Sequence, residues 1–235
     1  MTQYSYDAQL REEDGELFHY SDVSWTRKHV RAAADLLRDL KAHGYLQDDD
    51  HAFLDESTRA TVTLQFTASA DGDLTVPAGT RVRNLDPDGD GNTNGAVVFS
   101  TASNVIVTAG NTGTVDATAD QIGEVYNVDA GALAFLEDDA PTNFAAVTNT
   151  SPASGGVDHQ LTRAAVYKTA ELINQDLSRG PDDVFEHRRK LYRMSYKDEL
   201  ERLVASGVKI DTDGDGEISE CEKDLEHGFH RFRRS

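Results

Sequence analysis

The sequence predicts an α+β protein: a helical bundle that carries one small inserted all-β domain of sandwich or barrel type. The first observation is that apolar residues recur at helical spacing near both ends of the chain. The second is a middle region of short alternating stretches separated by Gly, Asn and Asp. Both patterns lie within one chain of 235 residues, which is long enough to bury a sizeable core. The predicted helices cover residues 22–43, 160–178 and 182–206.

These patterns predict three regions. Residues 1–55 hold an N-terminal arm and a helix, residues 56–157 the inserted β domain, and residues 158–235 a helical domain with an EF-hand-like cation loop at 211–222. The early helix needs a partner for its apolar face, so we expect it to pack with the late helices. Insertion of the β domain between them costs little, because loop closure entropy grows slowly with loop length.

The composition bounds the function. The chain has 42 acidic and 23 basic residues, a net charge of −19, which disfavours both DNA wrapping and binding to anionic membranes. Asp exceeds Glu and Arg exceeds Lys, a bias that resembles proteins of salt-loving archaea. An ordinary acidic protein, or a channel wall past which DNA slides without sequence-specific binding, would carry the same charge. No apolar run approaches the roughly 20 residues of a membrane span, and no secretory signal is expected. Cys221 is the single cysteine, so synthesis in a cytoplasm is expected.

The first region combines two patterns. Residues 1–20 mix aromatic and charged side chains, which fits either an arm that orders against a neighbour or a mobile terminus. For the helix at 22–43, Ser21 is a suitable N-cap and Gly44 a suitable stop. Its apolar stripe is predicted to consist of Val23, Val30, Ala33, Ala34, Leu37 and Leu40.

The β region contains three clear alternating stretches, at Ala60–Phe66, Asn104–Thr108 and Gly113–Ala117. Short strands at this spacing are typical of a small sandwich or barrel. Residues 151–156 are interpreted as an exit linker.

In the region after residue 158, the spacing of apolar residues predicts two helices separated by Gly180 and Pro181. Pro181, Asp182 and Asp183 suit the first turn of the second helix. The first stripe comprises Leu161, Ala165, Val166, Ala170, Ile173 and Leu177, and the second Phe185, Tyr192, Tyr196, Leu200 and Leu203.

Residues 211–222 fit the calcium loop of an EF-hand. Carboxylates fall at the first, third, fifth and twelfth positions, Gly216 permits the sharp turn, and Ile218 points to a core. The expected ion is Ca²⁺, with Mg²⁺ as the alternative, and one permanent site suits a staple for the C-terminal helices better than a sensor. The predicted ligands are Asp211, Asp213, Asp215, the Glu217 carbonyl, Ser219 and Glu222.

A second acidic loop begins with the same spacing at Asp86, Asp88 and Asp90, but Val97 stands where the final Glu should be. It fits either a further cation site or a polar β-turn tip.

Catalytic patterns are weak. The sequence has no His-Glu-x-x-His, no paired cysteines, no Gly-x-Ser-x-Gly and no phosphate-binding loop, so no catalytic residue is predicted. Asp183 and His187 lie four residues apart and are interpreted as a solvated pair. Two basic runs, Glu186–Arg193 and His230–Arg234, fit either solvated surfaces or docking onto acidic neighbours.

Four phrases resemble one known family. In order they are Thr75–Val82 (TVPAGTRV), Val98–Thr101 (VFST), Gly123–Gly131 (GEVYNVDAG) and Val147–Asp158 (VTNTSPASGGVD). Over residues 74–158 the chain is similar to the baseplate J-like family, which supplies structural β-modules to contractile tails and related injection machines.

The resemblance implies a structural virion protein of a tailed virus, and the charge suggests a haloarchaeal host. Family members are longer and carry further domains, whereas helices flank the β-module here, an arrangement that resembles a head-to-tail connector (adaptor) subunit. The implied partners are further copies in a ring, of twelvefold symmetry for a connector, together with portal and tail or stopper proteins. A baseplate or tail component is the alternative, followed by a calcium-binding interaction protein and by a glycan-degrading virion enzyme, for which no catalytic pair is identified.

Overall fold

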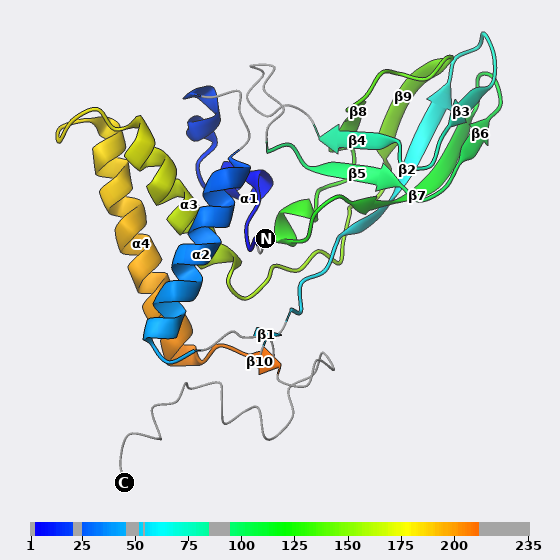
Figure 1. Ribbon diagram of the computed structural model, residues 1–235. Coiled ribbons are helices and arrows are strands. Elements are labelled where there is room, and N and C mark those ends of the chain that lie inside the picture. Colours follow the sequence, from blue (N-terminus) through cyan, green and yellow to red (C-terminus); the bar gives the residue numbers. More distant parts are fainter. Residues whose placement is uncertain (1–2, 21–24, 46–51, 54, 85–94, 212–235) are drawn as a thin grey trace. The chain divides into compact units, whose positions relative to one another are not determined.

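The computed structural model describes residues 3–20, 25–45, 52–53, 55–84 and 95–211. The chain divides into two compact units (Figure 1). The helical unit comprises Met1–Leu17, Val23–Glu56 and His159–Ser235, and the β unit comprises Phe18–Asp22 and Ser57–Asp158. Among the described residues, no helix is long and apolar enough to cross a membrane.

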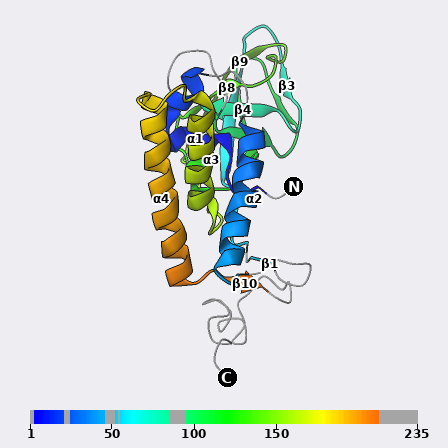
Figure 2. The ribbon, with the colours of Figure 1, turned by 60° about the vertical axis from the view of Figure 1, so that its left-hand side comes forward.

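Three long helices make up most of the helical unit. Figure 2 shows α3 between α2 and α4, and α3 contacts both of them as well as α1. Their apolar faces meet in one core whose large members include Leu36, Leu40, Leu161, Tyr196 and Leu200. The helices are α1 (Asp7–Glu13), α2 (Thr26–Ala42), α3 (Thr162–Leu177) and α4 (Val184–Ser206), and the 3-10 turn η1 spans Gly15–Tyr20.

The structure corrects the start and the face of α2. The helix begins at Thr26 instead of residue 22, and the proposed cap Ser21 lies outside the described residues. Ala34 is exposed and Leu36 is buried in its place, because the true stripe follows positions 29, 32, 33, 36 and 40. The predicted stop at Gly44 is confirmed: its φ is 98°, and the Tyr45 N–H donates to the Leu40 carbonyl over 3.1 Å.

The start of α4 differs slightly from the prediction. Asp183 is the N-cap, and its carboxylate accepts from the Phe185 N–H over 3.0 Å, so Pro181 and Asp182 precede the helix. This bond and one from the Arg179 N–H lower the pKa of Asp183. His187 Nδ1 lies 3.0 Å from the Asp183 carbonyl oxygen, so the carboxylate and the imidazole are not paired.

The segment after α4 is extended. Gly207 ends the helix with a φ of 85°, and β10 (Ile210–Asp211) pairs antiparallel with β1 (Ala52–Phe53). Asp211, the first predicted calcium ligand, therefore starts from a short strand instead of the last turn of a helix.

The β unit is a nearly closed barrel, as the alternating pattern predicts. Its six-stranded sheet has the order β8-β4-β5-β7-β2-β9 and all its pairs are antiparallel. The edge strands β8 and β9 contact each other, so the sheet curls round on itself. We call the gap between them the seam. The strands are β2 (Thr61–Ala68), β4 (Arg81–Asn84), β5 (Val98–Thr101), β7 (Thr112–Ala119), β8 (Leu133–Leu136) and β9 (Phe144–Asn149).

Side chains that alternate between buried and exposed along the strands fill the interior of the barrel. In β2, every second residue from Val62 to Ala68 is buried, which confirms the predicted strand at Ala60–Phe66. The other two predicted strands correspond to β6 (Val105–Val107) and β7, and β6 pairs with β3 (Leu74–Val76). A 3-10 turn, η2 (Glu124–Tyr126), brings Tyr126 edge-on to Phe99 with ring centroids 6.3 Å apart.

The exit of the β unit is fastened to its entry. Thr58 bridges Val157, and Thr61 bridges Ser154. The segment interpreted as a linker therefore pairs with the first residues of the unit.

Candidate functional site: the loop junctions of the barrel

The first junction joins two of the phrases singled out in the sequence. Thr101, at the end of β5, is 3% exposed and faces the turn at residues 77–80. Its hydroxyl donates to the Pro77 carbonyl over 2.8 Å and accepts from the Thr80 N–H over 3.0 Å. The Gly79 N–H also donates to the Thr101 carbonyl over 2.8 Å. One threonine thereby ties the phrases TVPAGTRV and VFST together.

The second junction joins the other two phrases. Asn127 forms two hydrogen bonds of 2.8 Å with the backbone of Gly156, one to its carbonyl and one from its N–H. A Cβ at Gly156 would lie 2.3 Å from the Gly123 carbonyl oxygen, so this position admits only glycine. The Glu124 N–H also donates to the Asp158 carboxylate over 3.2 Å.

The seam is joined by Asn149. This side chain is 1% exposed and lies at the end of β9. Its Oδ1 accepts from the Leu133 N–H of β8 over 2.9 Å, and its Nδ2 donates to the Asp129 and Ser151 carbonyls, each over 2.9 Å. The Gly131 N–H adds a 2.8 Å bond to the Asn149 carbonyl. Asn149 thus supplies, through its side chain, contacts that a closed ladder would supply through its backbone.

These junctions have the chemistry of structural joints. The polar side chains at their centres, Thr101, Asn127 and Asn149, are committed to backbone groups, and none is a titratable group poised beside a nucleophile. These side chains hold together, in one fixed arrangement, loops that are distant from each other in the sequence.

The comparison with known families agrees. Residues 63–156 match the family model described as the Baseplate J-like protein barrel domain. Residues 63–156 form a Baseplate J-like barrel domain. The predicted resemblance over residues 74–158 is therefore confirmed, and the domain also includes β2. A Baseplate J-like barrel is a structural module and not an enzymatic one, in line with the predicted absence of catalysis.

No curated protein matches the chain. Among solved structures, the chain is similar to a protein in the cryo-EM structure of the anti-feeding prophage baseplate, 6-fold symmetrised, with a TM-score of 0.35 and 11% identity. The similarity covers 55% of this chain and 39% of that one, so the chain spans about two fifths of its length.

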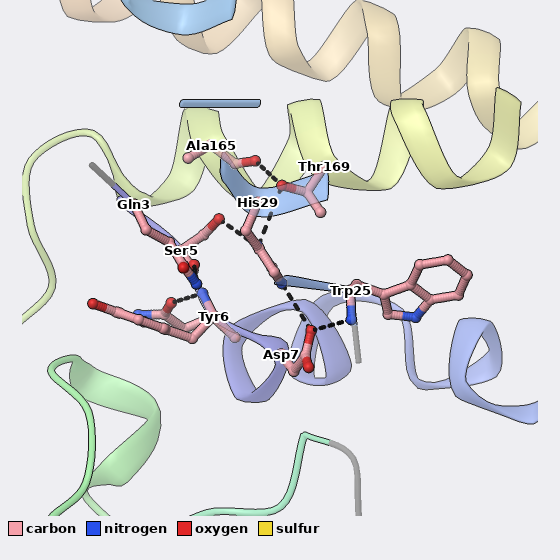
Figure 3. A network of polar contacts seen from close by, with 9 residues as sticks. Gln3, Ser5, Tyr6, Asp7, Trp25, His29, Ala165 and Thr169 are labelled. Carbon is pink, nitrogen blue, oxygen red and sulfur yellow. Dashed lines mark hydrogen bonds and ion pairs between the residues drawn. The ribbon is translucent and has the colours of Figure 1, made fainter. Parts of the chain in front are cut away.

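The helical unit contains a buried Ser-His-Asp network (Figure 3). Ser5 Oγ lies 2.8 Å from His29 Nδ1, and Asp7 Oδ1 lies 2.9 Å from His29 Nε2. Thr169 Oγ1 on α3 lies 3.4 Å from the same Nδ1 and donates to the Ala165 carbonyl over 2.8 Å. Ser5 and His29 are 0% and 1% exposed, which denies a substrate access to the serine hydroxyl. The network therefore ties the N-terminal residues to α2 and α3.

A polar cleft of about 390 Å³ opens between α2, α3 and α4. In it, the Tyr196 hydroxyl donates to Asp39 over 2.7 Å, and Lys168 pairs with Glu171 over 2.7 Å while lying 4.9 Å from the centroid of the Tyr196 ring. Burial, reinforced by the Asp39 carboxylate, raises the pKa of Tyr196, so its hydroxyl stays protonated. Arg193 and Lys197 line the mouth from α4.

The predicted cation ligands are only partly described. Asp211 is 9% exposed on β10, whereas Asp213, Asp215, Glu217, Ser219 and Glu222 lie outside the described residues. Asp86, Asp88 and Asp90 also lie outside them, in the segment that joins the antiparallel neighbours β4 and β5. Within the described part of the chain, no group of three or more His, Cys, Asp or Glu residues is arranged to hold a metal.

Sequence reasoning missed the two side chains that matter most for the barrel. Asn127 and Asn149 lie inside the quoted phrases, but asparagine is so common in turns that neither was distinguished from turn punctuation. The Ser5–His29 contact gave no signal at all, because its members are 24 residues apart.

Proposed function

We propose that this protein is a structural subunit of a phage-type tail, with its barrel domain serving as an assembly module of the baseplate. The observation that carries the proposal is the Baseplate J-like barrel at residues 63–156, whose family phrases meet in closed junctions. A subunit of this kind works by presenting a rigid surface to its neighbours. It is therefore a virion component that is assembled in the host cytoplasm.

The test is to locate the protein in purified particles. Mass spectrometry should detect it in mature virions, and an antibody or gold label should mark the tail tip with sixfold symmetry. Particles that lack the protein after complete assembly would refute the structural role.

A head-to-tail connector (adaptor) subunit is the second candidate. It is supported by the helical unit, which takes residues from both sides of the barrel domain, as a helical host with an inserted module does. In that position the protein would form a ring below the portal, in contact with portal and tail or stopper proteins, and DNA would pass without sequence-specific binding. Labelling at the neck with near twelvefold symmetry would favour the connector over the baseplate.

The loop at residues 211–222 is proposed to bind Ca²⁺, with Mg²⁺ as the competing ion. Support comes from the ligand spacing and from the position of Asp211 on β10, which is held by pairing with β1. An ion bound there stabilises the folded form, by about 2.7 kcal/mol at a free concentration of 100 Kd. The bound ion would then stabilise the chain where its C-terminal segment follows β10.

Glu222→Gln removes the proposed twelfth-position ligand and should weaken calcium binding measured by calorimetry. It should also abolish the rise in melting temperature on adding calcium. Glu220→Gln makes the same chemical change at a non-ligand position and should behave like the wild type. Equal calcium responses in the two variants would refute the site.

The net charge of −19 supports a salt-rich host for the virus. An acidic surface of that density repels itself in dilute buffer and is screened by concentrated salt. The melting temperature should therefore rise steadily with added KCl, and a flat response would argue for an ordinary acidic protein.

A further inference from the structure

The solvent side of α4 carries large apolar side chains. Val184, Leu191 and Met194 are 55%, 65% and 63% exposed, and the helical repeat places them on one side of the helix, away from the buried Tyr196 and Leu200. We define the α4 outer face as Val184, His187, Lys190, Leu191, Met194 and Lys197. Exposed apolar side chains that lie together on one face of a helix are candidates for an interaction site.

The same stretch is basic in an otherwise acidic chain. Residues 184–197 hold five basic side chains and one acidic one, a formal charge of +4, so the rest of the chain carries −23 against the total of −19. Arg188 and Arg189 are already engaged, Arg188 with Asp14 and Glu16 and Arg189 with Glu186. Lys190 lies 3.7 Å from the same Glu186 carboxylate, but its side chain is 59% exposed and can also meet an approaching molecule.

Two cations remain available at the edge of this face. Among the described residues, neither Arg193 nor Lys197 forms an ion pair, and both line the polar cleft. Of the three acidic residues that line the cleft, Asp39 accepts from Tyr196 and Glu171 pairs with Lys168, whereas Glu201 is exposed to solvent. The cleft mouth can therefore receive a carboxylate from another molecule.

We propose that the α4 outer face binds an acidic surface of a second copy of this chain. The partner follows from charge complementarity: every copy presents −23 outside this stretch, so a neighbouring copy offers the complement at equal concentration. A symmetric contact of α4 on α4 would instead bring two basic faces together. The contact is therefore head-to-tail, which generates a ring where the rotation closes. This proposal rests on the proposed function, because the α4 contact would serve the self-assembly of a tail subunit.

The charged and the apolar side chains of the α4 outer face contribute differently to binding. Lys190 and Lys197 orient the approaching acidic surface, and this contribution fades with salt as the Debye length falls from about 10 Å at 0.1 M to about 3 Å at 1 M. Leu191 and Met194 supply the apolar contact, which salt does not screen.

Sedimentation velocity of the full chain tests the proposal at both salt concentrations. Wild-type protein should self-associate. Lys190→Glu/Lys197→Glu should weaken association by about tenfold or more at low salt and much less at high salt. Leu191→Ser/Met194→Ser should weaken it by a similar factor at both. Arg31→Glu/Lys41→Glu, which reverses two exposed charges on α2, is the matched control and should stay within about twofold of wild type. Circular dichroism should show all variants folded.

A wild-type chain that stays monomeric at about 100 μM, or variants that associate as tightly as the control, would overturn the proposal. Capture of a different acidic tail protein by a monomeric wild type would also overturn it. The two proposals fail separately. Protein found in particles but monomeric in solution refutes only the α4 contact, whereas salt-dependent self-association of a protein absent from particles refutes only the tail role.

Discussion

Replacing Asn149 with alanine should destabilise the barrel more than any other single polar substitution at its junctions. The change removes three hydrogen bonds of 2.9 Å that join β9 to residues 129, 133 and 151. It also leaves the Leu133 N–H without its acceptor at a site where Asn149 is 1% exposed. At about 1 kcal/mol for each bond, the loss of unfolding free energy is about 3 kcal/mol. For a chain of this length that unfolds in one transition, the melting temperature should fall by about 6–12 °C.

Differential scanning calorimetry measures the change, with Asn111→Ala as the control. Asn111 is exposed and its Nδ2 makes one local bond to the Ala109 carbonyl, so its loss should cost less than about 0.5 kcal/mol. If both variants melt within about 2 °C of each other, the seam does not depend on Asn149 and our account of barrel closure is wrong.

Two further predictions concern Gly156 in the barrel and His159 in the helical unit. Gly156→Ala places a methyl group 2.3 Å from the Gly123 carbonyl oxygen and should break both hydrogen bonds between Asn127 and residue 156. The free energy of unfolding, measured by urea titration, should fall by about 2–3 kcal/mol. Gly180→Ala is the control, because a Cβ there meets open space, and it should be near neutral in the same titration. Burial lowers the pKa of His159, against the smaller opposing effect of Asp55, so the folded protein resists protonation that the unfolded chain accepts. Stability should therefore be complete above pH 6.5 and decline below it by up to about 1.4 kcal/mol per pH unit. His159→Asn keeps an acceptor for the Leu161 N–H and should remove this part of the decline; an unchanged pH profile would contradict the assignment.

The junctions explain why the four family phrases together indicate the barrel fold more specifically than any one of them alone. Each phrase alone is a turn with glycine and a short polar residue. In the folded chain they meet in pairs, through Thr101 at one junction and Asn127 at the other. A chain with one phrase altered would lose partners for the buried backbone groups of another, so the four phrases must be present as a set.

By itself the sequence determined the element types. Alternation in β2 and the helical type of α3 and α4 follow from local periodicity, and Gly44 ends α2 because only glycine readily adopts the left-handed conformation there. The family phrases likewise identified the barrel domain from residues alone.

Only the tertiary structure decided which polar side chains hold the protein together. The seam at Asn149 and the buried Ser5–His29–Asp7 network join residues that are separated along the chain, and no local pattern distinguishes an asparagine that closes a barrel from one in an ordinary turn. The choice of Leu36 over Ala34 on α2 was also tertiary, since the face a helix buries is set by the neighbours it meets. The exposed apolar face of α4 is of the same kind, because periodicity reveals an apolar residue but not whether the chain covers it.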